Sequence, residues 1–395
     1  MSGLQRVNNR VDSFSNQDYK IKKLHKIVDD LLKDKNFDEL TFSYPGNNIN
    51  ENVGQKTVHF NSDKKDHHND YEKSKNIFDY PSKQDINKDA SLESTIKLYK
   101  SIGDRNADFL FNWLYNIYSN IYLSSIDNTY KEPLTLTKTK LGIFDVLIDD
   151  LADNSKMRDK QLLEECMKIP WENSQIYYDN QYFLVAKQIW LECINSIQEF
   201  PRYNDFKDIF YFDIQQFMNC NRYSFLINTK NSSNFIEDKA YLHHGVMVLT
   251  HCDLDLMCSP DFDYNELEKL RPILYTVQDF FHIGNMLNTY PREIGESDLS
   301  SPIISLALRK GLIQKNTLKD DPEYTLESLK PLVPIFEKRM KDDLSTINRH
   351  LKEIRSIDME KFYNQLKKVG NEFLTRKPYW KNYNKEVEEK PLKFF

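Results

Sequence analysis

The chain has 395 residues, with 54 Lys or Arg and 60 Asp or Glu, so its formal net charge is −6. Both signs of charge are interspersed along the whole length, and no basic stripe of the kind that follows a nucleic-acid backbone is present. We therefore expect no nucleic acid among its partners, while the length allows a substantial hydrophobic core.

Cysteine usage and apolar segments indicate the cellular setting. Five cysteines occur without a CxxC pair, which is typical of reduced core thiols in a cytoplasmic protein. The first residues lack the apolar core of a signal peptide, and no run of about 18 apolar residues follows, so we expect no stable membrane insertion. Only ten glycines are present, which disfavours an all-β fold. A monomer and a homodimer are both compatible with these features.

Residues 1–92 are predicted to form a polar N-terminal arm that is partly disordered. The segment "DYKIKKLHKIVDDLLKD" has the pattern of an amphipathic helix, but the tract after it is polar and has no hydrophobic period. The string "DHHND" in this tract carries metal-binding side chains. No second ligand cluster accompanies it, so a solvated polar segment is the better interpretation.

Residues 93–395 are predicted to form one all-α domain. Apolar residues recur at i, i+3, i+4 and i+7 in block after block, as in Leu267, Leu270, Leu274 and Val277. The predicted helices are 94–103, 106–124, 138–153, 158–168, 177–199, 204–229, 236–257, 264–295, 299–312 and 325–370. Turn-forming strings such as "FPRYND", "CSPDFD" and "LKDDPEY" separate some of them. The pattern predicts a large helical bundle.

The segment "FDVLIDDLADN", residues 144–154, carries a cluster of acidic side chains on a predicted helix. Its aspartates are Asp145, Asp149, Asp150 and Asp153. Three of them stack at intervals of four, where like charges repel and destabilise an isolated helix. Either a bound cation offsets this repulsion or the face is simply solvated.

A second set of oxygen-bearing side chains occurs in "IGNMLNTYPRE", residues 283–293. Asn285, Thr289 and Glu293 are spaced by four, so their oxygens share one face of a helix. An oxygen-only set suits Mg²⁺ or Mn²⁺ rather than Zn²⁺. The alternative is a polar face turned to water.

Together, the two faces resemble the motifs of the class I terpene synthases (terpene cyclases). That family pairs a DDxxD helix with a later NxxxSxxxE helix across the mouth of an α-helical barrel. The matching residues here are Asp149, Asp150 and Asp153 for the first motif, and Asn285, Thr289 and Glu293 for the second. Arg292 matches the basic residue often found before the final glutamate. The resemblance covers roughly residues 93–385 and leaves the arm without a counterpart.

The resemblance implies a cyclase that ionises a linear prenyl diphosphate, farnesyl or geranylgeranyl diphosphate. About three Mg²⁺ ions, for which Mn²⁺ can substitute, would neutralise the leaving group, with Asp149, Asp150 and Glu293 as catalytic residues. The carbocation would close in a dry cavity to a sesquiterpene or diterpene hydrocarbon or alcohol, with release of diphosphate. Aromatic faces stabilise such a cation by about 0.5 to 2 kcal/mol each. Candidate lining residues are Trp113, Tyr118, Phe144, Phe225 and Phe281, for each of which plain core packing is the alternative.

The chain departs from the family pattern at its diphosphate-binding positions. The basic residue usual before the second motif is missing, and Lys239 or His243 could substitute for it. Gly245 fits the helix break expected in the same segment. Pro291 removes a hydrogen bond inside the second ligand helix and could displace Glu293 through a kink. In place of the family's C-terminal Arg-Tyr pair, "TRKPYW" offers the candidates Arg376, Lys377 and Tyr379.

Other functions of helical proteins stay open. A prenyl-chain elongating synthase would need a second Asp-rich motif where this chain has Asn285, and head-to-head synthases need two DxxxD faces, of which Asp145 and Asp149 supply one. An HD-type phosphohydrolase is excluded because no His-Asp dipeptide occurs. A non-catalytic helical scaffold of the same fold remains as an alternative.

Overall fold

The computed structural model describes residues 90–171 and 178–375, all of which belong to one compact unit of the chain. Every regular element in these two ranges is helical and none is a strand, which confirms the predicted all-α class. No helix in the described part of the chain is both long and apolar enough to cross a membrane. The predicted arm before residue 90 lies outside the described residues, as do Arg376, Lys377 and Tyr379.

The helices follow one another with short connections. The α-helices are α2 (Ala90–Lys100), α3 (Ala107–Asn120), α4 (Lys131–Ala152), α5 (Lys160–Cys166), α6 (Gln181–Gln198), α7 (Tyr203–Lys230), α8 (Phe235–Tyr241), α9 (Val248–Met257), α10 (Leu267–Glu296), α11 (Pro302–Arg309), α12 (Thr317–Asp320), α13 (Pro322–Leu329), α14 (Val333–His350) and α15 (Met359–Thr375). The 3₁₀ helices are η2 (Asn128–Tyr130), η3 (Leu242–Val246), η4 (Tyr264–Glu266), η5 (Lys330–Leu332) and η6 (Leu351–Glu353).

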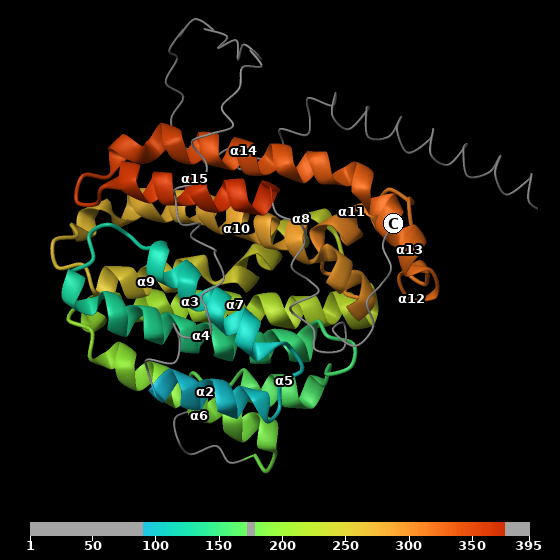
Figure 1. The fold of residues 1–395 in the computed structure, drawn as a ribbon, viewed down its shortest axis with the longest axis horizontal. Helices are drawn as coiled ribbons and strands as arrows, with labels where there is room; N and C mark the ends of the chain where they lie inside the picture. The colour runs from blue at the N-terminus through green and yellow to red at the C-terminus, as the bar shows by residue number, and fades with distance from the viewer. Residues whose placement is uncertain (1–89, 172–177, 376–395) are drawn as a thin grey trace, which may run out of the picture. The chain divides into compact units, whose positions relative to one another are not determined.

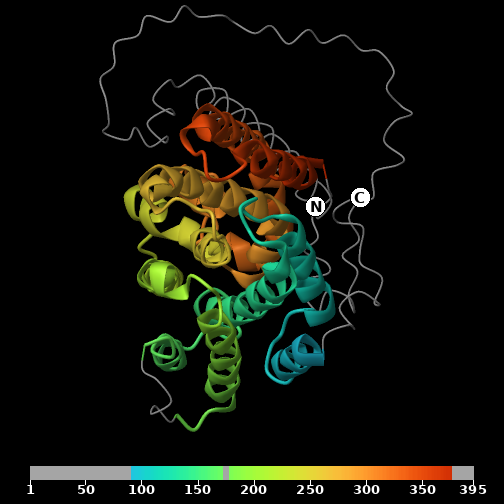
Figure 2. The ribbon, with the colours of Figure 1, turned by 90° about the vertical axis from the view of Figure 1, so that its left-hand side faces the viewer.

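The acidic segment 144–154 lies at the end of α4, and the segment 283–293 lies in α10. A different group of helices packs around each of these two motif-bearing helices. Helix α4 packs against α3, α6 and α7, whereas α10 packs against α9, α14 and α15. Figures 1 and 2 show α14 and α15 along one edge of the bundle and α2, α5 and α6 along the opposite edge, with α4, α7 and α10 between them. The two motif-bearing helices therefore lie inside the bundle, each covered on its outer side by other helices.

Helix α4 begins at Lys131, seven residues before the predicted start at 138. The string "TLTKTK" alternates β-branched and other residues, which disfavours a helix by propensity. In the structure Thr135, Thr137 and Thr139 donate their hydroxyl hydrogen bonds to backbone carbonyls one turn earlier, at 2.8, 2.8 and 2.7 Å. All three threonines are buried, and their burial outweighs their low helix propensity.

Two of the predicted helices are divided in the structure. The segment 236–257 forms α8, η3 and α9, and Met247 before α9 has a left-handed backbone with φ 48°. The segment 325–370 contains α13, η5, α14, η6 and α15 instead of one helix. Pro331 and Pro334 begin new helical segments there, because proline lacks the N–H group that a continuing helix requires.

Helix α10 is continuous through both Pro272 and Pro291. Its packing against α15 depends on Gly284, because a Cβ at this position would overlap the ring of Phe373. A close approach of this kind is possible only where a side chain is missing.

Candidate functional site

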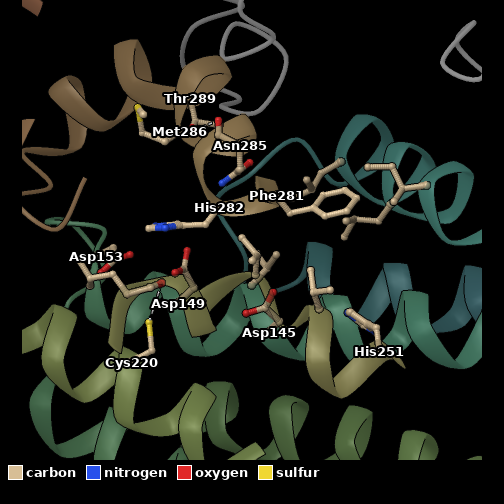
Figure 3. A pocket seen from close by; sticks show the side chains of 18 of the residues that line it. Asp145, Asp149, Asp153, Cys220, His251, Phe281, His282, Asn285, Met286 and Thr289 are labelled. Carbon is tan, nitrogen blue, oxygen red and sulfur yellow. Dashed lines mark hydrogen bonds between the residues drawn. The ribbon is translucent and has the colours of Figure 1, made fainter. Parts of the chain in front are cut away.

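A cavity of about 220 Å³ lies between the two motif-bearing helices. Side chains of α3, α4 and α7 line it on one side, and those of η3, α9, α10 and α15 complete it. Figure 3 shows Asp145, Asp149 and Asp153 on the α4 wall and Asn285 and Thr289 on the facing α10 wall. The structure thus brings both predicted ligand faces to the same cavity.

On the α4 wall, the acidic side chains follow the helical period. Asp145, Asp149 and Asp153 are half-buried and line the cavity. Burial, and next the negative charge of Asp149, raise the pKa of Asp145 well above its usual range. Burial and the charges of Asp298 and Asp149 do the same for the pKa of Asp153. One carboxylate oxygen of Asp145 and one of Asp153 are buried with no hydrogen-bond partner among the residues that the structure describes.

Asp150 points away from the cavity, although the sequence predicts it as a metal ligand. It is fully buried, and its Oδ1 accepts a hydrogen bond from Arg105 Nε at 2.8 Å. Burial raises its pKa to about 6, against the opposing effect of Arg105. One step along a helix turns a side chain by about 100°, so Asp149 and Asp150 cannot share a face. Asp145 occupies the cavity wall instead.

On the α10 wall, all three predicted ligands line the cavity. Thr289 Oγ1 donates to the Asn285 carbonyl at 2.9 Å and also contacts Glu293 Oε1. Burial raises the pKa of Glu293 to about 7, with Arg292 acting in the opposite direction. The second carboxylate oxygen of Glu293 has no hydrogen-bond partner in the described ranges. Pro291 does not end the helix or separate Thr289 from Glu293.

Two arginines lie among the carboxylates at the acidic end of the cavity, where Asp149, Asp153 and Glu293 are found. Arg105, from the loop before α3, pairs with both Asp149 and Asp150. Arg292 pairs with Glu296 on the next turn of α10, and its Nη2 lies 3.9 Å from Glu293 Oε1. Both arginines line the cavity, and sequence reasoning identified only Arg292. Arg105 lies in a loop and has no periodic neighbours, so no local pattern could reveal it.

Two further predicted anion-binding residues, Lys239 and His243, do not line the cavity. Burial, and next the positive charge of Arg339, lower the pKa of Lys239. His243 Nδ1 donates to the Lys239 carbonyl at 3.0 Å, and burial lowers the pKa of this imidazole. Gly245 does line the cavity, at the break between α8 and α9.

Among the predicted aromatic residues, the structure separates lining residues from core residues. Trp113, Tyr118 and Phe281 line the cavity. Phe144 instead is fully buried against Trp190, with ring centroids 5.1 Å apart. Phe225 packs against the hydrophobic core and is not among the lining residues. Each of these two follows or precedes a lining residue in a helix, so its side chain points about 100° away from the cavity.

The end of the cavity remote from Asp149 and Asp153 carries a second polar group, of which the sequence analysis named only Tyr118. Tyr118 on α3 and His251 on α9 hydrogen bond at 2.8 Å. Beside them, Lys138 on α4 forms a buried ion pair with Asp255 on α9. All four residues line the cavity.

The acidic end of the cavity does not form a complete metal cage by itself. Among the described residues, no three His, Cys, Asp or Glu side chains are placed to hold a metal ion. The unpartnered carboxylate oxygens of Asp153 and Glu293 nevertheless fit hard divalent cations. Mg²⁺ commonly takes only one or two protein carboxylates and completes its shell with water and substrate phosphates. The residues therefore fit Mg²⁺ that is bound together with an oxyanion.

Fold and cavity together define an all-α protein with a cavity that is acidic at one end, has apolar side chains in its lining, and carries a second polar group at the other end. No family model matches the chain, and no curated protein gives a significant match. The function is therefore inferred from the residues of the cavity itself.

Proposed function

We propose that the protein is a Mg²⁺-dependent class I terpene cyclase that acts on a linear prenyl diphosphate, farnesyl or geranylgeranyl diphosphate. The observation that carries this proposal is the meeting of two oxygen-rich helix faces in one cavity. Asp149 and Asp153 come from α4, and Thr289 and Glu293 come from α10. If each face merely contacted solvent, the fold would have no need to bring these two distant segments to the same cavity.

The charges at the acidic end suit a cation and an anion bound together. Its carboxylates are those of Asp145, Asp149, Asp153, Glu293, Glu296 and Asp298, and its guanidinium groups are those of Arg105 and Arg292. The excess of carboxylates attracts divalent cations, and the arginines can donate to phosphate oxygens. Bound Mg²⁺ would supply Lewis-acid neutralisation of the leaving diphosphate. Asp149, Asp153, Asn285, Thr289 and Glu293 are the residues that would hold it.

The middle of the cavity can take the hydrocarbon part of the substrate. The apolar side chains of the cavity lining include Leu110, Trp113, Leu114, Ile117, Val277, Phe281 and Met286. Apolar walls exclude water, which would otherwise capture a carbocation. The faces of Trp113 and Phe281 can stabilise positive charge without forming a bond to it.

The direct test is incubation of the purified full-length protein with Mg²⁺ and, separately, C10, C15 and C20 prenyl diphosphates. Diphosphate release and mass spectrometry of a hexane extract report the reaction. We expect cyclic products from the C15 or C20 substrate, and no products in excess EDTA. Addition of isopentenyl diphosphate tests the elongating-synthase alternative, which predicts longer prenyl diphosphates instead. If no substrate releases diphosphate, the protein is a helical scaffold rather than a cyclase.

A further inference from the structure

The end of the cavity opposite the carboxylate cluster is polar, in contrast to its apolar middle. Helix α4 carries Lys138 about three turns before Asp149, a separation of about 16 Å along the helix axis. In Figure 3, His251 lies beyond Asp145 as seen from Asp149 and Asp153. The polar groups at this end are therefore well separated from the place where diphosphate would bind.

Lys138 and Asp255 form the fixed part of this polar end. Their side chains are 2% and 1% exposed and pair with each other. Asp255 Oδ2 also accepts the backbone N–H of Leu123 at 3.0 Å. Breaking a buried pair of this kind is strongly unfavourable, so both side chains are expected to stay in place.

Tyr118 and His251 form the part that can exchange a proton. The Tyr118 hydroxyl lies 2.8 Å from His251 Nε2, and the two ring centroids are 4.4 Å apart. Burial, and next the positive charge of Lys138, lower the pKa of His251 well below its usual range. The imidazole is therefore neutral at physiological pH, with a lone pair on one ring nitrogen. His251 Nδ1 has no hydrogen-bond partner in the part of the chain that the structure describes.

We propose that Tyr118 and His251 together form the proton acceptor that ends the carbocation reaction and makes its product an alkene. This inference rests on the proposed cyclase function. The C–H bond beside the cationic carbon breaks, and its electron pair forms the new C=C bond. The proton passes to the Tyr118 oxygen while Tyr118 gives its own proton to the lone pair of His251 Nε2. The products of the step are a neutral alkene, a neutral tyrosine and an imidazolium.

The surroundings favour both the uptake and the later loss of this proton. A carbocation is a far stronger acid than an imidazolium, so even an imidazole with a lowered pKa accepts its proton. Once the step is complete, the buried imidazolium lies near the positive charge of Lys138. This repulsion drives the proton to water when product leaves, which returns His251 to its neutral state.

Asp145 is the other base along this wall and has to be tested beside the pair. Its pKa is raised well above its usual range, chiefly by burial, and its charge contributes to the raised pKa of Tyr118. A variant at Asp145 therefore distinguishes an acceptor at Tyr118 and His251 from one on α4.

The experiment compares product shares in the wild type, Tyr118→Phe, His251→Gln and Asp145→Asn, each normalised to the diphosphate released. Tyr118→Phe keeps the ring and removes the hydroxyl, while His251→Gln keeps a hydrogen-bond acceptor that cannot take a proton. Tyr211→Phe is the matched control, because Tyr211 is a half-buried phenol of α7 outside the cavity lining. We expect the share of the main wild-type alkene to fall at least about tenfold in the first two variants. The Tyr211→Phe shares should equal those of the wild type.

Several outcomes would overturn the inference. Unchanged shares in both Tyr118→Phe and His251→Gln, with diphosphate still released, would leave the cyclase in place and remove this role. Lower total turnover with constant shares would assign the pair a structural role only. A change confined to Asp145→Asn would move the acceptor to α4. If the wild type releases no diphosphate from any prenyl substrate, the proposed function fails and this inference fails with it.

Discussion

Arg105 Nη2 lies 2.8 Å from Asp149 Oδ2, so a guanidinium group from the loop before α3 holds the carboxylate that α4 presents to the cavity. The same side chain also donates from Nε to the buried Asp150. A metal ion that binds Asp149 competes with Arg105 for this carboxylate. The released part of the guanidinium would then be available for the diphosphate that arrives with the metal.

The first prediction concerns this exchange. Arg105→Lys keeps a positive charge beside Asp150 but loses the planar group that can contact two partners. We expect the affinity for inorganic diphosphate in the presence of Mg²⁺ to fall about tenfold, as for the loss of one charge-assisted hydrogen bond. Isothermal titration calorimetry measures it without any need for turnover. Arg222→Lys, at an exposed pair with Glu164, is the control. Equal affinities in Arg105→Lys and the wild type would contradict the exchange.

The second prediction separates the neighbours Asp149 and Asp150. Asp149→Asn removes a cavity-facing charge and should raise the Mg²⁺ concentration needed for half-maximal activity by about tenfold or more. It should lower stability less than the Asp150 variant, because Asp149 is partly exposed and Asp150 still pairs with Arg105. Asp150→Asn instead leaves Arg105 buried without its full counter-charge and should reduce the free energy of unfolding by about 3 kcal/mol. Mg²⁺ titrations and urea unfolding of both variants test this contrast. If Asp150→Asn instead raises the Mg²⁺ requirement and Asp149→Asn causes the larger loss of stability, Asp150 is the ligand.

The third prediction concerns the α10 wall. Glu293→Gln keeps the side-chain volume but removes the full negative charge of this ligand set, and we expect the rate to fall roughly a thousandfold. Thr289→Val should be severe because it removes the oxygen, whereas Thr289→Ser should be mild because it keeps it. Steady-state diphosphate release measures all three. Wild-type rates in both Thr289→Val and Glu293→Gln would remove the ligand role of this face.

The periodicity of the sequence was sufficient to place much of this site. A spacing of four puts side chains on one helix face, and Asn285, Thr289 and Glu293 all line the cavity as a result. The same geometry explains why Asp150 and Phe144 do not line it. Motif strings name consecutive residues, but a helix turns by about 100° between them. Reading the α4 face by its period alone would have selected Asp145 rather than Asp150.

Residues that meet only through the tertiary fold could not be predicted. Arg105 reaches Asp149 from a loop, and Lys138 meets Asp255 from a different helix. No local spacing relates such partners, because their contact depends on how α3, α4 and α9 pack. The early start of α4 was missed for a related reason, since burial compensates for the low helix propensity of its threonines. The all-α class was predictable because it depends on local periodicity.

The last prediction concerns pH and the metal-free protein. Burial raises the pKa of Glu293 to about 7 in the folded state, above its ordinary value of 4.5. The folded state therefore binds more protons at this site than the unfolded state, so this group's contribution to the free energy of unfolding falls as pH rises from about 4.5 to 7. Buried histidines act in the opposite direction below about pH 6.5, because burial lowers the pKa of His244 to about 3 and of His282 to about 4.

A comparison of wild type with Glu293→Gln cancels the histidine contribution. Because glutamine resembles the protonated acid, the two proteins should unfold at similar urea concentrations at pH 5 in EDTA. At pH 8 we expect the variant to be more stable by up to about 3 kcal/mol. A difference that is constant across this range would show that Glu293 ionises normally in the folded protein.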